Sequence, residues 1–428
     1  MSGAHARLAA AVAVLAAMLA LAACGSEDSP TGPQRLDLKI GDLLPRTGFM
    51  EQFAQPGEQA ADLAIDEIRQ ATAKAGAQHR VTITHVDYKS QPITAVDLSE
   101  KLVERGSSCL VGPWGSGQAG RVVSRVSAPR KVLQISPSAS GSELSKAEDR
   151  GYLYRTVPSD TLQADALAEL LDDRLRGARG KKVNVGALKS TYGEGLTKSF
   201  QDAWTGKGGQ VGERVTYRGD QPTFEDQAQG LASGEPDAWV FFDFQDTYAR
   251  MANDLLAREG VKFSPRKAFA GDSLATARLA SVAPAVSNGL RGVAIGAPKR
   301  GQAAEEFDKR FKARGPAKRQ TFDAQQFDAV VLCYLSAVAA GSTSGEKMKD
   351  EVRAVSAPPG RKFTWLQLDE AVKALQAGQD IDYEGASGPI DLNDDGDPTA
   401  GVYDVYEFRS GKLRIREQIA VPDRPGGI

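Results

Sequence analysis

Short apolar runs alternate with helix-periodic segments from residue 36 onwards. The runs predict strands at 36–43, 81–88, 108–112 and 131–136. A loop at 45–57 is expected before the first helix. Apolar residues three and four positions apart predict helices that end at Gly76 and near Gly106, and a third helix at 118–129. This alternation predicts a mostly parallel sheet with helices on both faces.

A second series of the same kind follows the extended connector YLYRTVPSD, after which Asp160 is expected to cap a helix. Further strands are predicted at 183–188, 239–244, 267–271 and 292–297, and helices at 193–206, 246–258, 303–313, 323–340 and 364–377. Two apolar segments around Arg409–Gly411 predict an antiparallel hairpin at the end of the chain. The chain is therefore an α/β protein with two sheets.

The stretch from Cys109 to Leu144 carries the strongest indication of a binding site. It contains two predicted strands that each end in a small, hydroxyl-rich loop, with Ser116 in the first loop and Ser138 and Ser140 in the second. Ligands of parallel sheets bind beyond the carboxyl ends of the strands, and free N–H groups at a helix N-terminus favour an anion. The serines predict a neutral site for one carboxylate.

Composition narrows the class of partner. The 428 residues are 41% apolar and 25% charged, with a formal net charge of −2. A chain without a basic surface or runs of Lys and Arg is not expected to bind nucleic acid.

The N-terminus has the plan of a secretory signal. His5 and Arg7 precede the apolar run 8–23, which is short for a bilayer span, and Leu21-Ala22-Ala23-Cys24 matches a lipobox. We expect a lipoprotein signal peptide at 1–23, acylation of Cys24, and a flexible tether through residue 35. A plain secreted protein cleaved nearby is the alternative.

Two cysteines remain after Cys24. Cys109 falls in a predicted strand and Cys333 in a predicted helix, and they show no disulfide framework. Both are expected to be buried small apolar residues.

Several motifs in order resemble the type I periplasmic substrate-binding proteins of ABC importers, in the branched-chain amino-acid-binding group. They are IGDLLPRTG with AADLAIDEI, LVGPWGSG, QISPSAS, YLYRTVPSD, LKSTYGEG and YEGASGPIDLNDDGD with GVYDVYEF. The resemblance covers roughly residues 36–420. It implies a two-lobed fold, each lobe a mostly parallel sheet flanked by helices, hinged by three crossovers. The implied division is 36–155 for lobe one, 156–289 for lobe two, 290–382 for the return to lobe one, and 383–428 for the closing strands and tail.

The resemblance also implies roles for single residues. Ser116, Ser138 and Ser140 correspond to groups that hold a ligand carboxylate. Tyr192 corresponds to an aromatic residue that closes on the ligand from lobe two, and Phe53 to an aromatic wall. The acidic partner of an amino group falls on Ser273, so Asp272 and Asp243 are the candidates for that role. A further aromatic position of the family falls on Gln245.

Three other patterns in the sequence suggest cofactor or metal sites, but their context favours simpler interpretations. Gly115–Gly120 fits G-x-G-x-x-G, but it does not follow the first strand, and no acidic residue ends the next strand, so a dinucleotide site is not expected. Asp391–Gly396 matches half of a calcium loop, but Val402 stands where a bidentate Glu is needed, which favours a turn. His79 and His85 lie in or beside a strand without nearby ligands, so no metal or cofactor is expected. Asp243 and Asp246 can also be read as solvated rim charges.

The sequence thus predicts a membrane-tethered, extracytoplasmic receptor without catalysis. It would capture a small amino acid or related carboxylate and present it to an ABC permease. The motifs of common hydrolases, zinc proteases and P-loop enzymes are absent from the sequence. A ligand-sensing module for a membrane receptor or kinase is the alternative, and an extracellular enzyme on the same scaffold is a third possibility.

Overall fold

A computed structural model describes residues 35–422 of the chain. The predicted signal peptide, Cys24 and nearly all of the tether lie outside the described residues. Among residues 35–422, no helix combines the length and the apolar character that a membrane crossing needs.

The first lobe is built on a five-stranded sheet with the order β2-β1-β3-β4-β5. Its strands are β1 (Arg35–Leu44), β2 (Gln78–Asp87), β3 (Cys109–Val111), β4 (Leu133–Ser136) and β5 (Leu153–Arg155). Three neighbouring pairs in this sheet are parallel: β1 with β3, β3 with β4, and β4 with β5.

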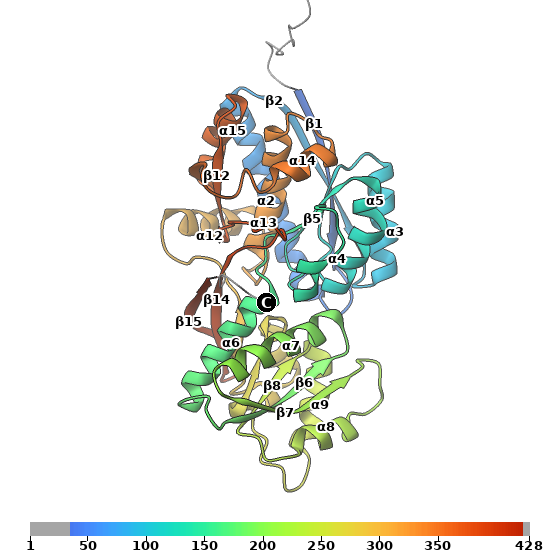
Figure 1. Ribbon diagram of the computed structural model, residues 1–428, viewed down its shortest axis with the longest axis vertical. Coiled ribbons are helices and arrows are strands. Elements are labelled where there is room, and N and C mark those ends of the chain that lie inside the picture. Colours follow the sequence, from blue (N-terminus) through green and yellow to red (C-terminus); the bar gives the residue numbers. More distant parts are fainter. Residues whose placement is uncertain (1–34, 423–428) are drawn as a thin grey trace, which may run out of the picture. The chain divides into compact units, whose positions relative to one another are not determined.

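Eight helices and a small sheet surround these strands (Figure 1). The helices are α2 (Glu51–Ala75), α3 (Pro92–Glu104), α4 (Ser116–Val122), α5 (Ala128–Arg130), α12 (Gln302–Arg314), α13 (Asp323–Ala339), α14 (Gly345–Glu351) and α15 (Leu368–Gln376). A π turn at Val123–Ser127 joins α4 to α5. The small sheet contains β11 (Arg361–Thr364), β12 (Ile381–Gly385) and β13 (Gly388–Pro389).

Alternation along β1 explains how this sheet is covered. Leu36, Leu38 and Ile40 are buried in one core with apolar residues of α2, α13 and α15. Leu110 of β3 instead joins Ala95 and Leu102 of α3 in the core on the opposite face. Because successive strand side chains point to opposite faces, β1 and β3 each contribute to both cores.

The second lobe is built on a seven-stranded sheet with the order β15-β14-β10-β9-β8-β6-β7. Its strands are β6 (Lys182–Leu188), β7 (Gln210–Tyr217), β8 (Ala238–Phe242), β9 (Ala268–Ala270), β10 (Arg291–Ile295), β14 (Ala400–Arg409) and β15 (Lys412–Pro422). Its helices are α6 (Asp160–Leu175), α7 (Thr191–Gly206), α8 (Glu225–Ala232), α9 (Gln245–Leu256), α10 (Ala277–Val282) and α11 (Pro284–Ser287).

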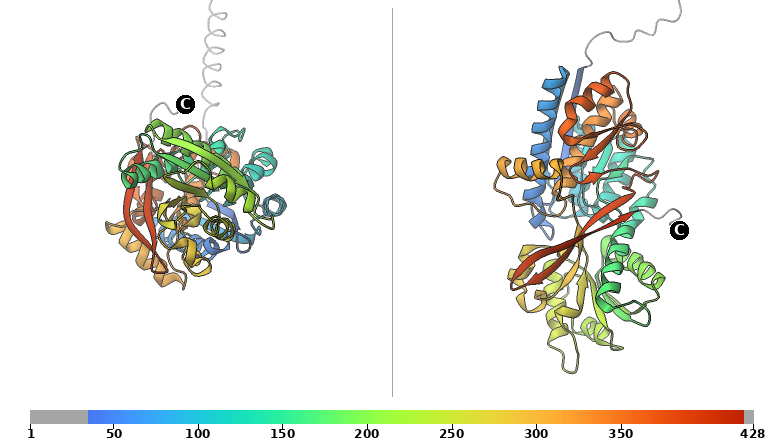
Figure 2. Two further views of the ribbon diagram at one scale, coloured as in Figure 1. Left: turned by 90° about the horizontal axis from the view of Figure 1, so that it is seen from below. Right: turned by 90° about the vertical axis from the view of Figure 1, so that its left-hand side faces the viewer.

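The central strand β8 is buried on both faces. Val240 and Phe242 pack in a core with α6 and α7, whereas Trp239 and Phe241 pack in a core with α8 and α9. The strands β6 to β10 are parallel, and β14 adds to β10 in the antiparallel direction. The predicted hairpin is confirmed: β14 and β15 form a long antiparallel ribbon with an irregularity between Val405 and Tyr406 (Figure 2).

Two predicted boundaries between the lobes need correction. β10 was assigned to the return segment that begins at residue 290, but it hydrogen bonds to β9 and β14 of the second sheet. The boundary at residue 383 falls inside β12, which pairs with β11. The chain therefore leaves the second sheet after Ile295 and returns to it before β14. A sequence pattern identifies a strand but not the sheet that the strand joins.

Local details also differ from the prediction. The loop at 45–57 is shorter than expected, because α2 already begins at Glu51 and contains Pro56. Ser159, rather than Asp160, caps α6, and its side chain accepts from the N–H of Thr161. The exposed strand β7 and the short helices α8 and α14 were not predicted, because their apolar periodicity is weak.

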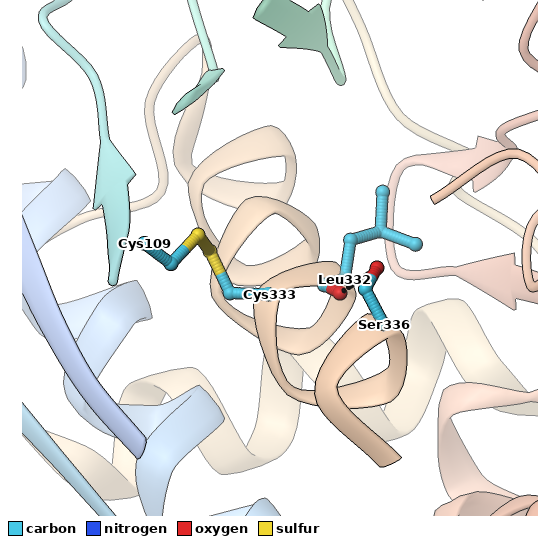
Figure 3. Close-up of a disulfide and its surroundings, with 4 residues drawn as sticks. All are labelled: Cys109, Leu332, Cys333 and Ser336. Carbon is cyan, nitrogen blue, oxygen red and sulfur yellow. Dashed lines mark hydrogen bonds between the residues drawn. A yellow bond between two sulfur atoms is a disulfide. The ribbon is translucent and has the colours of Figure 1, made fainter. Parts of the chain in front are cut away.

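Cys109 and Cys333, for which the sequence shows no disulfide framework, are nevertheless bonded to each other. The two residues form a disulfide between β3 and α13, with Cα atoms 6.1 Å apart (Figure 3). Both are fully buried, as predicted. Their separation of 224 residues explains why the sequence shows no such framework, because only the fold brings β3 and α13 together.

Removing this disulfide should destabilise the protein. A crosslink that closes a long loop restricts the unfolded chain, so the double variant Cys109→Ala/Cys333→Ala should lose about 2–4 kcal/mol of unfolding free energy in urea. Wild-type protein kept reduced, without alkylation of the buried thiols, should lose stability in the same direction. An intact mass showing two free thiols in oxidised protein would contradict the assignment.

Candidate ligand-binding cleft

Loops from both lobes meet around one small cavity, and the space of about 310 Å³ between them includes open solvent. These loops follow the carboxyl ends of β3 and β4 in the first lobe and of β6, β8 and β9 in the second. The lining residues are Met50, Phe53, Trp114, Gly115, Ser116, Ser138, Ser140, Tyr192, Phe244, Asp272, Ser273 and Phe322. Seven of the eight residues predicted for ligand binding are among them.

The three predicted serines lie on the first-lobe side of the cavity. Ser116 begins α4, and its hydroxyl accepts from the N–H of Gly141 at 3.1 Å, which joins the two serine loops. Ser136, just before the second loop, donates to the carbonyl of Pro113 at 2.7 Å and accepts from the N–H of Ala139. These bonds hold the hydroxyls of both loops beside the free N–H groups of α4, a combination suited to an anion.

A buried arginine fixes the second serine loop from behind. Arg155 is 1% exposed and donates to the carbonyls of Ala139 and Gly141 at 3.1 and 2.9 Å. Its Nε donates to Asp397 at 2.6 Å, and its other terminal nitrogen donates to Ser145 at 2.8 Å. Sequence analysis did not single out Arg155, because its carboxylate partner lies 242 positions away.

The segment Asp391–Gly396, which matches half of a calcium loop, positions the carboxylate that binds Arg155. Asn393 accepts from the N–H groups of Asp395 and Asp397, and Gly396 has a φ of +75°, so the segment forms the predicted turn. The turn presents the Asp397 carboxylate to Arg155, and the carbonyl of Gly396 accepts from the N–H of Arg155 at 3.0 Å. Within residues 35–422, no group of three or more His, Cys, Asp or Glu residues is arranged to hold a metal ion.

The second lobe contributes a hydrogen-bonded polar group. The Tyr192 hydroxyl donates to Asp272 at 2.7 Å and lies 3.0 Å from the Ser273 hydroxyl. Ser190 caps α7 and accepts from the N–H of Gly193, which places Tyr192 in the first turn of that helix. Asp272 and Ser273 both line the cavity, so a carboxylate lies next to the position that the family motif assigns to an acidic residue.

Asp160 is a second buried acid behind the cavity that sequence reasoning assigned only to a helix cap. Gln163 links the two acids: its amide donates to Asp160 at 3.3 Å, and its oxygen accepts from the N–H of Asp272 at 3.0 Å. Burial raises the pKa of Asp272 to about 6. Burial and the Asp272 charge raise the pKa of Asp160 well above its ordinary value. Both acids are therefore harder to ionise than an exposed aspartate, and the charge of Asp272 adds to this effect for Asp160.

Asp243 does not line the cavity. Its carboxylate accepts from the Tyr217 hydroxyl at 2.8 Å and from the N–H of Phe244 at 2.7 Å, inside the second lobe. Burial raises its pKa to about 8. Both readings made from the sequence, an ammonium partner and a solvated rim charge, are therefore wrong for Asp243. Asp246, in contrast, is exposed as expected.

Aromatic rings form most of the remaining wall. Phe322 contacts Phe53 and Trp114 edge to face, with centroids 5.4 and 5.9 Å apart, and Tyr192 lies 5.8 Å from Phe244. Phe322 has a φ of +76°, a left-handed conformation that is unfavourable for a bulky residue and that the ring packing must compensate. Trp114, Phe244 and Phe322 were not predicted. The first two could have been found, because they lie two or three residues after the ends of buried strands.

The histidines and a second groove lie elsewhere. His85 of β2 bonds to Asp42 at 2.7 Å and to Asp62 at 3.2 Å; burial opposes its charge, but these carboxylates outweigh it and raise its pKa to about 9. A wider groove in the second lobe contains none of the predicted residues. Most of its charged side chains pair with one another, as Arg291 and Arg416 do with Glu407.

Two α/β lobes joined by three connections, with a cavity lined from both, define a two-lobed solute-binding protein. The chain belongs to the periplasmic binding protein family, whose model matches residues 37–411. Its fold is similar to those of solved leucine-binding and branched-chain amino-acid-binding proteins.

Three similar proteins illustrate the range of this family. A chemotactic signal transduction system substrate-binding protein, BasB of Halobacterium salinarum, is 23% identical over 88% of each chain. A Leu/Ile/Val-binding protein homolog of Brucella melitensis is 25% identical over 88% of this chain and 93% of its own. The structure of an ABC transporter solute-binding protein from R. palustris with benzoate has a TM-score of 0.69 at 20% identity, over 90% of this chain and 98% of its own.

The Arg155–Asp397 pair gives a test of the serine loop. Asp397→Asn leaves the buried guanidinium without its carboxylate, so unfolding free energy should fall by about 3–5 kcal/mol. Asp395→Asn, an exposed change in the same turn, is the matched control and should leave stability unchanged. Denaturant titration of both variants measures the effect, and equal stability would show that the pair does not support the loop.

Proposed function

We propose that the protein is an extracytoplasmic solute receptor that captures a small carboxylate with an apolar side group, either a branched-chain amino acid or a related acid. The cavity itself carries this proposal. Hydroxyls and N–H groups of the first lobe face Tyr192 and Asp272 of the second, and aromatic rings close the sides. A carboxylate would bind at the serines, and the apolar group would lie among the rings.

Delivery to an ABC importer is the proposed role. The R. palustris structure named above, which is of an ABC transporter solute-binding protein, supports it. Acylation at Cys24 would hold the receptor at the membrane beside its permease, and this part rests on the sequence alone. Recovery of a Cys24→Ser variant in the soluble fraction would support the anchor. The receptor performs no chemistry in this proposal.

A sensing role is the second candidate, because BasB is named as part of a chemotaxis system. The same ligand-bound form would then be read by a membrane receptor instead of a permease. Uptake of labelled ligand by cells that lack the gene separates the two roles. Lost uptake supports transport, whereas normal uptake with a lost response to the ligand supports sensing.

The ligand class can be tested by calorimetry with L-leucine, L-isoleucine, L-valine and benzoate. Ser116→Ala and Ser138→Ala should each weaken binding by about 1.5–3 kcal/mol, the range for hydrogen bonds to a charged group, which is tenfold or more. Ser124→Ala, an exposed serine outside the cavity, is the control. Binding by neither wild type nor variants would leave only the fold and family established.

The pH dependence of binding distinguishes an amino acid from a plain carboxylate. Because the Asp272 pKa is about 6, the acid is ionised at neutral pH and becomes protonated as the pH falls through 6. Affinity for L-leucine should then fall, approaching tenfold per pH unit well below 6. Benzoate binding should stay level or strengthen, since the repelling charge disappears. In Asp272→Asn, the leucine profile should become flat; a wild-type-like profile would exclude Asp272 as the amine partner.

A further inference from the structure

The two lobes also contact each other beside the cavity. Glu51 and Gln52 stand in the first turn of α2 in the first lobe. Gln245 begins α9, and Arg278 lies in α10, both in the second lobe. Glu51 pairs with Arg278, and the Gln245 amide donates to the Gln52 oxygen at 2.9 Å. These four residues are called the latch.

The position of the latch ties it to the ligand. Gln52 directly precedes Phe53 in the sequence, and Gln245 directly follows Phe244. The rings of both phenylalanines line the cavity. Phe49 of the first lobe packs on Phe244 with ring centroids 4.6 Å apart. Gln245 is only 1% exposed, so its bond to Gln52 is shielded from water, whereas the side chains of Glu51 and Arg278 are about 40% exposed.

We propose that the latch holds the lobes closed over the ligand and sets how fast the ligand leaves. The latch residues are positioning residues, because none of them lines the cavity. This inference rests on the proposed function, and it assigns a task to Gln245 at a position where the family motif has an aromatic residue. Closure is favoured because both pairs form only when the lobes meet.

A double-mutant cycle tests the ion pair. Glu51→Gln and Arg278→Gln should each raise the dissociation rate of L-leucine, or of benzoate if that is the acid that binds, by about 1.5- to 5-fold, as expected for an exposed pair. The double variant should resemble each single variant, because the same interaction is lost. Higher salt should speed dissociation from wild type but not from the variants. Stopped-flow fluorescence gives these rates.

Matched controls separate the latch from general charge effects. Arg218→Gln breaks an exposed Arg218–Asp220 pair within the second lobe and should leave the rate unchanged. Gln245→Ala should raise the rate further than Arg278→Gln, because a buried hydrogen bond is lost. Single-variant rates equal to wild type, or effects that add in the double variant, would overturn the proposal.

Scattering makes the inference testable even if neither acid binds. A Cβ at Gly195 of α7 would come 2.7 Å from the Glu143 carboxylate and 3.6 Å from the Ser142 hydroxyl of the first lobe. The Glu143 side chain can move aside for a Cβ, but the larger side chain of Gly195→Leu also meets Ser142, so this variant should hold the lobes apart and supply the scattering profile of the open form. Arg278→Gln should shift ligand-free protein towards that profile. With no ligand bound and this shift present, the proposed function fails and the latch stands. No shift, and no change in ligand dissociation, rejects the latch.

Discussion

The buried ion pair of Arg155 and Asp397 is the interaction on which the cleft depends. It joins the connection between β5 and α6 to the connection between β13 and β14, so two of the three links between lobes meet at one charge pair. The same guanidinium holds the carbonyls of Ala139 and Gly141. A buried charge is tolerated only when its hydrogen bonds are complete, and these partners complete them. The loop that carries Ser138 and Ser140 is therefore held in place by residues of the connections between the two lobes.

Charge in the cleft is divided between the lobes. The first lobe offers hydroxyls and N–H groups without a net charge at the cavity, because the Arg155 charge is neutralised behind it. The second lobe offers Asp272, whose ionisation is weakened by burial, which raises its pKa. A zwitterion would match both sides at neutral pH, whereas a simple acid would use only the first. The distinction between ligands thus depends on one carboxyl group.

Two groups of residues lie between the lobes, the rings that line the cavity and the latch residues, and they would have different tasks. The rings around the cavity set the shape that a ligand must fit, since they line the cavity and pack against one another. The latch residues, including Glu51 and Arg278, respond to the distance between the lobes and not to ligand chemistry. In this arrangement, ligand selection and ligand retention are carried by different residues, so each can change without the other.

The sequence by itself determined the α/β class, most strands and helices, and the loops that carry Ser116, Ser138 and Ser140, because these features depend on local periodicity and turn residues. The family resemblance added Phe53 and Tyr192 to the expected cavity. Only the tertiary structure decided that β10 belongs to the second sheet, that Cys109 meets Cys333, and that the Asp243 carboxylate binds Tyr217 instead of facing the cavity. Each of these depends on residues far apart in the chain or on the face to which a side chain points, and a linear pattern records neither.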